Sequence, residues 1–159
     1  MLITELFTSD KTQLGNPARA YPLEYLTMNN SRMHATARAG TRWLMIDLVR
    51  VSHREDPRVL EIGFEVDGSM DITGGGDAVA IFNTVLVAIN HFLQHNLAPD
   101  FFIFAAEGSS RVSLYNRMLS RFLARVGYAS AGYDDLPDSV KQNWWGGIGG
   151  DVFIAKRIK

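Results

Sequence analysis

The sequence predicts one α/β (α+β) domain, in which a mixed, mostly antiparallel sheet of five to seven strands packs with two main helices. Segments 42–52 and 59–67 have the apolar patterns of strands, and segment 100–107 is a continuous apolar run. Two other segments, 78–95 and 109–126, repeat apolar residues every three or four positions, as amphipathic helices do. Strand and helix patterns therefore alternate along the second half of the chain.

The first half of the chain is expected to supply an arm and a set of strands. Residues 1–22 are predicted to be an N-terminal arm, because a short apolar start is followed by a stretch rich in Asp, Gly, Asn and Pro. The single domain then spans 23–159. Segment 23–38 has strand-like alternation, and segment 42–52 is apolar on both faces, which is typical of a strand inside a sheet. Segment 59–67 is its expected antiparallel hairpin partner.

In the second half, each helix pattern is followed by a strand pattern. The first helix is expected to begin after three glycines, with Asp77 or Gly76 as its cap, and to stop before Pro99. The second helix is expected to start at Ser109-Ser110 and to end at Gly127. An irregular stretch with a short helical turn near 137–143 then leads to a last strand over 151–158.

Composition excludes several classes of protein. The 159 residues carry 16 Lys and Arg against 17 Asp and Glu, and there is no Cys. The lack of Cys excludes disulfides, thiolate metal sites and a Cys nucleophile. A net charge of −1 argues against nucleic-acid binding over the whole surface. Neither a signal peptide nor a membrane-spanning segment is expected, so we expect the protein in the cytoplasm or in a particle assembled there.

A glycine-rich segment lies where the first helix begins. Backbone N–H groups of glycines converge easily, and a helix N-terminus adds partial positive charge, so this segment could hold a phosphate group. The alternative is a tight strand-to-helix turn capped by Asp77, which the absence of a following Lys and the nearby Asp71 favour. The candidate cofactor-binding residues are Gly74, Gly75, Gly76, Asp77 and Ala78.

The second helix carries a row of arginines. Arg117, Arg121 and Arg125 are spaced by four and share one face, Arg111 lies in the first turn, and no acidic residue occurs between Ser109 and Tyr133. Such a row can contact an acidic protein surface or nucleic-acid phosphates. The alternative is an ordinary solvated helix face whose arginines pair with the acidic residues at 134, 135 and 138.

Two adjacent tryptophans, Trp144 and Trp145, precede a Gly-Gly-Ile-Gly-Gly segment. Two neighbouring indoles do not easily face one core, so one of them is a candidate for partner contact, since Trp is enriched at interface hot spots. The alternative is that both cover one end of the sheet. His91 and His95 have a spacing compatible with a metal ion, but a favourable position near a helix C-terminus explains them better, and no metal site is expected.

The order of elements resembles the GNAT (GCN5-related N-acetyltransferase) fold over residues 42–158. Asp71-Ile-Thr-Gly74-Gly75-Gly76 aligns with that family's pyrophosphate-binding loop, although Asp71 replaces its leading Arg or Gln. Gly127-Tyr128 matches the end of the family's second helix, but Leu123 stands where the family has its catalytic Tyr. The resemblance implies acetyl-CoA as cofactor, with Tyr115 and Glu107 as candidate acid and base.

Other segments resemble small proteins of tailed bacteriophages. They are Ile3-Thr4-Glu5-Leu6-Phe7, the run from Asp71 to Ala78, Ile81-Phe-Asn-Thr-Val85, and the run from Ser110 to Met118. This resemblance implies a phage setting, in the host cytoplasm or the virion, and no particular activity. Because both catalytic hallmarks of the GNAT family are altered, we expect a non-catalytic protein without a cofactor.

These residues and resemblances lead us to expect one of two functions for the chain. The first is binding of a phage or host protein, as a virion or assembly component or as a host-directed factor, through the four arginines and two tryptophans. The alternative is an acyl-CoA-dependent N-acetyltransferase. Nucleic-acid binding through the arginines is less favoured because of the net charge, and the sequence is compatible with an oligomer.

Overall fold

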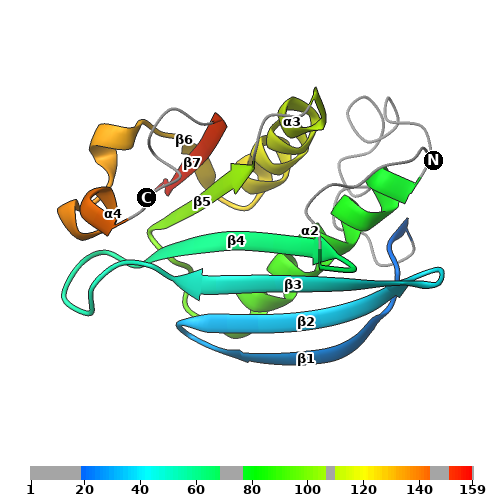
Figure 1. The fold of residues 1–159 in the computed structure, drawn as a ribbon. Coiled ribbons are helices and arrows are strands. Elements are labelled where there is room, and N and C mark those ends of the chain that lie inside the picture. The colour runs from blue at the N-terminus through cyan, green and yellow to red at the C-terminus, as the bar shows by residue number, and fades with distance from the viewer. Residues whose placement is uncertain (1–18, 69–76, 107–109, 144–150, 159) are drawn as a thin grey trace. The chain divides into compact units, whose positions relative to one another are not determined.

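The computed structural model describes residues 19–68, 77–106, 110–143 and 151–158. Seven strands, two long helices and two short helical segments alternate along these ranges (Figure 1): β1 (Leu23–Asn29), β2 (Arg32–Ala39), β3 (Arg42–Arg50), β4 (Val59–Val66), α2 (Asp77–His95), β5 (Phe101–Ala106), α3 (Ser110–Arg125), β6 (Tyr128–Ser130), η3 (Tyr133–Asp135), α4 (Asp138–Asn143) and β7 (Asp151–Arg157).

The strands form one seven-stranded sheet in the order β1-β2-β3-β4-β5-β7-β6. The β1–β2, β5–β7 and β6–β7 pairs are antiparallel, whereas β4 and β5 run parallel, with Val59 opposite Phe101 and Ile62 opposite Phe104. The strands β3 and β4 are antiparallel, because the Asp67 N–H bonds the Trp43 carbonyl and the Val51 N–H bonds the Val59 carbonyl. The predicted mixed, mostly antiparallel sheet with two main helices is confirmed.

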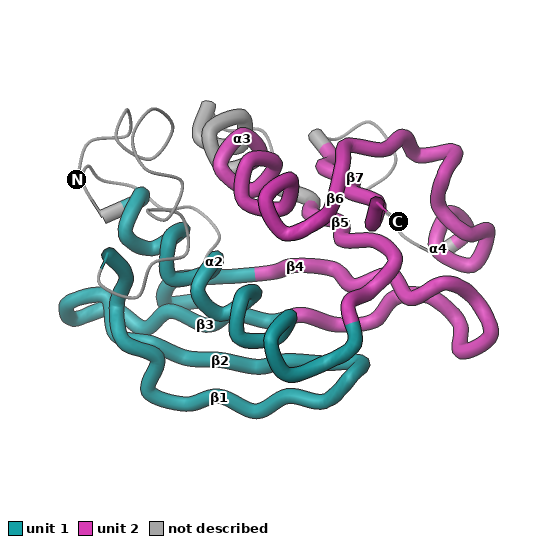
Figure 2. Tube along the Cα trace, turned by 180° about the vertical axis from the view of Figure 1, so that it is seen from behind, with its two compact units in different colours: residues 1–47, 64–97 teal, residues 48–63, 98–159 magenta. Residues whose placement is uncertain are grey.

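The chain divides into two compact units (Figure 2). Unit 1 comprises residues 1–47 and 64–97, and unit 2 comprises residues 48–63 and 98–159. Unit 1 therefore holds β1, β2, α2, most of β3 and the end of β4. Unit 2 holds the start of β4 and the elements from β5 to β7.

In unit 1, α2 covers one face of the sheet. Figure 1 shows β1, β2 and β3 in front of α2, and Phe64 of β4 meets Phe82 of α2 with ring centroids 5.6 Å apart. The inward positions of β2 alternate with outward ones, and three of them are alanines, whose small side chains let the helix approach closely. The buried inward residues of β2 and β3 are Met33, Ala35, Ala37, Ala39, Leu44 and Ile46.

The strand β3 lies inside the sheet, between β2 and β4, as its apolar pattern predicted. Of its two largely apolar faces, only the one that carries Leu44 and Ile46 is buried. Trp43, on the other face, is 41% exposed. The strand lies inside the sheet along the hydrogen-bonding direction, but α2 covers a single side of it, so its outer apolar side chains remain in contact with solvent.

Residues 19–22 lie along α2 and are held by two buried polar side chains. The Asn83 amide donates a 2.8 Å hydrogen bond to the Arg19 carbonyl, and the Thr84 hydroxyl accepts one of 2.9 Å from the Tyr21 N–H. Both Asn83 and Thr84 are fully buried. By length and hydropathy, residues 78–95 also meet the criterion for a membrane span, but 67% of this segment is buried inside the protein, as in a core helix.

Unit 2 is built on its own apolar cluster. Val59, Phe101, Ile103 and Ile154 from the strands pack with Leu136 and Val140. The strand β6 was not predicted from the sequence, because it has only three residues and its partner strand β7 is distant in the sequence. The expected helical turn near 137–143 is α4, and α3 ends before Gly127, whose φ of +99° suits glycine.

Candidate partner-binding surface

The helix α3 separates an apolar face from a basic one. Met118, Leu119, Phe122 and Leu123 are buried, as the three- and four-residue spacing predicted. The guanidinium-bearing side chains of Arg117, Arg121 and Arg125 are exposed. Because residues four apart lie one above another on a helix, these side chains form a row whose successive members are separated by a rise of about 6 Å. We call them the arginine row.

All the charged residues of this helix are basic. α3 contains four arginines and no acidic residue over its 16 residues. Arg125 lies in the last turn, where a cation interacts favourably with the helix dipole, and its guanidinium lies 5.5 Å from the centroid of the Phe122 ring. The arginine row is thus a positive surface on a chain whose net charge is −1.

Two of the acidic residues expected to pair with these arginines have local partners. Asp138 lies 3.8 Å from the ammonium of Lys141 in the same short helix, and the Asp135 carboxylate accepts a 2.8 Å hydrogen bond from the Gly132 N–H. These contacts stabilise the turn that contains η3 and the start of α4.

Several predicted site residues lie outside the described residues. These are Gly74, Gly75, Gly76, Glu107, Trp144 and Trp145. Asp77, which was one of two predicted caps, is the first residue of α2, and Ala78 beside it is 6% exposed. Arg111 and Tyr115 belong to α3, but the positions of their side chains are outside the description. The structure therefore brings together Arg117, Arg121 and Arg125 and leaves the acyl-CoA site a prediction.

Among the described residues, no group of three His, Asp or Glu side chains could hold a metal ion. The His95 ring donates from Nδ1 to the His91 carbonyl at 2.8 Å, and the two rings lie 6.1 Å apart between centroids. This hydrogen bond gives the His95 ring a local partner at the end of α2.

Among the described residues, the clear pKa shifts belong to Tyr128 and Arg58, both in unit 2. Burial raises the pKa of the Tyr128 phenol, because the ionised form would lose its solvation there. Burial also lowers the pKa of the Arg58 guanidinium, and the charge of Arg50 adds to this effect. The Arg58 backbone N–H bonds the Asp100 carboxylate at 2.8 Å, and Arg157 lies 3.3 Å from the same carboxylate. These groups connect the ends of β4, β5 and β7, which is a structural role.

Sequence reasoning missed a second polar and aromatic surface. It lies on the outer face of the sheet in unit 1, where Tyr25 and Trp43 are 53% and 41% exposed. The Arg38 guanidinium lies 4.6 Å from the centroid of the Trp43 ring, and His34 Nδ1 is 2.8 Å from Asp47 Oδ1. A signal was present in the sequence for Tyr25 and Arg38, because segment 23–38 has strand-like alternation, whereas Trp43 belongs to segment 42–52, which is apolar on both faces.

Comparison with protein-family models, with curated proteins and with solved structures finds no significant match. The candidate surfaces therefore rest on the residues of this chain alone.

Proposed function

We propose that this chain is a non-catalytic, GNAT-like protein of a tailed bacteriophage that binds an acidic surface on a phage or host protein. Its place would be the host cytoplasm or the virion. The observation that carries the proposal is the exposure of Arg117, Arg121 and Arg125 along one face of a helix that has no acidic residue. Arg is among the residue types that contribute most at protein interfaces, because its planar guanidinium binds carboxylates with two hydrogen bonds.

An acidic protein helix has the geometry that complements this row. Carboxylates four residues apart on such a helix repeat at the same rise of about 6 Å as the three arginines. A nucleic-acid backbone is less favoured, because nucleic-acid-binding domains usually carry an extended basic surface, whereas this chain has a net charge of −1.

The test is capture of partners from phage-infected cells by the tagged chain. Replacing Arg117, Arg121 and Arg125 by Glu should abolish capture of the partner while the circular dichroism spectrum stays native. The matched control replaces the exposed Arg32, Arg54 and Lys156 by Glu, which changes the net charge equally, and should retain the partner. Equal loss in both variants, or retention in both, would overturn the role of the arginine row.

Nucleic acid is tested separately with labelled DNA and RNA. Binding that weakens steeply with added salt and disappears in the arginine-row variant would replace the protein partner by a nucleic acid.

The alternative function is an acyl-CoA-dependent N-acetyltransferase. It is supported by the parallel pairing of β4 and β5 and by the start of α2 at Asp77, directly after the three glycines. Helix N-termini bind phosphate groups through their unpaired N–H groups. Isothermal titration calorimetry with acetyl-CoA tests this alternative: heat of binding that is lost in the Gly75→Glu variant would support it, and absence of heat would eliminate it.

A further inference from the structure

The outer face of the sheet in unit 1 carries a compact cluster of aromatic and charged side chains. We propose that two copies of this chain pair through it, by a twofold contact of one cluster with the other. The members lie on three neighbouring strands: Glu24 and Tyr25 on β1, His34 and Arg38 on β2, and Trp43 and Asp47 on β3. Their contacts form two groups, Glu24–Arg38–Trp43 and Tyr25–His34–Asp47. We call this set the sheet-face cluster.

The irregular pairing of β1 with β2 helps to assemble the cluster. The register shifts between Leu23 and Tyr25, so Glu24 is the extra residue of a β-bulge. A bulge changes the direction of the side chains beside it, and here both Glu24 and Tyr25 contact outer residues of β2. The Glu24 carboxylate lies 3.9 Å from Arg38 Nε, and the Tyr25 ring meets the His34 ring edge-on at 6.1 Å between centroids.

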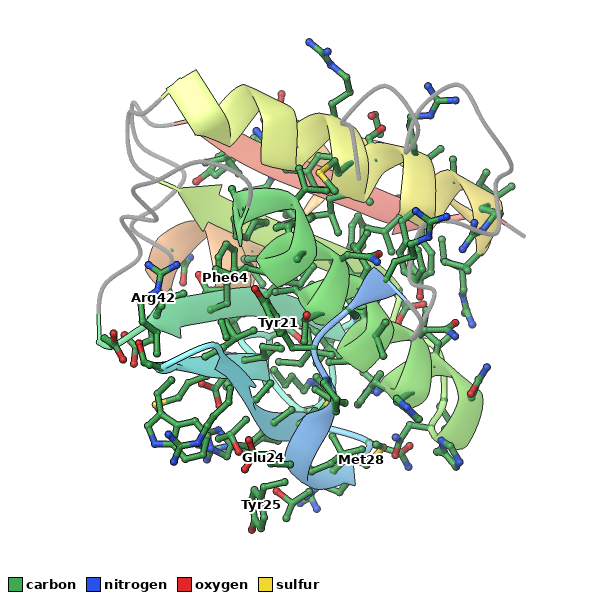
Figure 3. The ribbon with its side chains drawn as sticks, turned by 90° about the vertical axis from the view of Figure 1, so that its right-hand side faces the viewer. Tyr21, Glu24, Tyr25, Met28, Arg42 and Phe64 are labelled. Atoms are coloured by element: carbon green, nitrogen blue, oxygen red, sulfur yellow. The ribbon has the colours of Figure 1, made fainter. Side chains whose placement is uncertain are left out.

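The opposite face of these strands is occupied by α2, so the cluster points to the other side. Figure 3 shows Tyr25 on the side of β1 away from α2, whereas Phe64 lies toward that helix. Tyr25 is 53% exposed and Trp43 is 41% exposed, so two large aromatic side chains meet solvent on this face. Trp, Tyr and Arg together form the residue set that is enriched at interface hot spots.

The charges of the cluster favour a second copy as the occupant. Glu24 is paired with Arg38, and the Asp47 carboxylate lies 2.8 Å from His34 Nδ1, so this face presents both carboxylates and groups that complement them. The Glu24–Arg38 pair is separated by 3.9 Å, and its side chains remain 48% and 59% exposed, which leaves room for a second partner on each. A twofold contact brings the same residues of both copies together, so Arg38 of one copy can meet Glu24 of the other.

Other occupants fit less well. A polyanion such as single-stranded nucleic acid would meet the two carboxylates as well as the guanidinium. A purely acidic or purely basic protein surface would leave half of the cluster unmatched. Twofold dimers are the commonest assemblies of soluble proteins, and flat sheet faces pack about 10 Å apart with interdigitating side chains. The inference is independent of the arginine row, which lies on α3 in unit 2.

The test is the molar mass of the full chain in solution, measured by sedimentation equilibrium over a series of concentrations. We expect a monomer–dimer equilibrium whose dissociation constant rises at least about tenfold in Trp43→Ala, the change typical of a hot-spot residue. Arg54→Glu, an exposed change in the loop between β3 and β4, should leave the dimer intact. A monomer at every concentration, or a dimer indifferent to Trp43→Ala, would overturn the proposal.

A charge-exchange experiment tests the twofold contact itself. Arg38→Glu alone and Glu24→Arg alone should each weaken the dimer, because like charges then face each other across the twofold axis. A mixture of the two variants should regain a dimer that contains one copy of each. If the mixture sediments as the two separate variants do, the Glu24–Arg38 contact acts only within one copy and the proposed interface is wrong. Circular dichroism of each variant verifies that it is folded.

Discussion

The Tyr128 hydroxyl donates a 2.6 Å hydrogen bond to the Pro99 carbonyl oxygen inside unit 2. The two residues are 29 positions apart, and this bond connects the start of β6 with the turn that leads into β5. Tyr128 is 1% exposed, and its ring lies 5.0 Å from that of Phe102 between centroids. A polar group of this kind is retained in an apolar interior because its hydrogen bond is satisfied.

Tyr128→Phe should therefore destabilise the protein by about 1–3 kcal/mol, because the buried Pro99 carbonyl loses its donor and no solvent replaces it. Urea denaturation measures the change as a lower midpoint at an unchanged slope. The matched control is Tyr133→Phe, since the Tyr133 hydroxyl also donates to a backbone carbonyl, that of Lys141 at 3.0 Å, but is exposed. Water can replace that bond, and equal losses in the two variants would contradict the role of burial.

The same phenol makes stability depend on alkaline pH. Burial raises the pKa of Tyr128 above its ordinary value, so the unfolded chain releases this proton at a lower pH than the folded chain does. Above a pH of about 10 the unfolded state binds fewer protons, and the free energy of unfolding falls as the pH rises. Tyr128→Phe should flatten this fall relative to Tyr133→Phe when denaturation is measured at a series of alkaline pH values. Parallel curves for the two variants would contradict the prediction.

Thr84→Val should loosen the attachment of residues 19–22 to α2. The valine keeps the shape of the side chain but removes the oxygen that accepts the Tyr21 N–H and that donates a 2.7 Å hydrogen bond to the Ala80 carbonyl. We expect a loss of about 1–2 kcal/mol and faster proteolysis near residue 20. Thr84→Ser retains the hydroxyl and should retain most of the protection from protease. Cleavage at the same rate in both variants would show that this hydroxyl does not hold the segment.

Gly127→Ala should be costly because of the backbone conformation at the end of α3. Gly127 has a φ of +99°, in the left-handed region that side chains with a Cβ avoid, although space for the Cβ is open. The expected loss is about 1–2 kcal/mol of unfolding free energy. Gly132→Ala is the control, since its φ of −97° is ordinary and its added Cβ would meet the nearest atom at 3.7 Å. In thermal denaturation, the midpoint temperature of the Gly127→Ala variant should be well below that of the Gly132→Ala variant.

The elements that depend on local periodicity could be predicted from the sequence. The three- and four-residue spacing located α2 and α3, and the row of Arg117, Arg121 and Arg125 on an exposed face follows directly from helix geometry. The pairing of β6 with β7 could not be predicted, because it joins three residues to a strand more than twenty positions away and carries no local pattern.

The amino-acid sequence by itself determined where helices and strands form, since side-chain period is a local property. Only the tertiary structure decided which face of β3 is covered, because alternation distinguishes two faces but does not say which of them receives a helix. The packing of α2 on the other face leaves Trp43 in solvent, and the pairing of strands brings Arg38 beside Trp43 and brings Tyr25 and Asp47 beside His34. The sheet-face cluster is thus a product of packing, whereas the arginine row is a product of helical spacing.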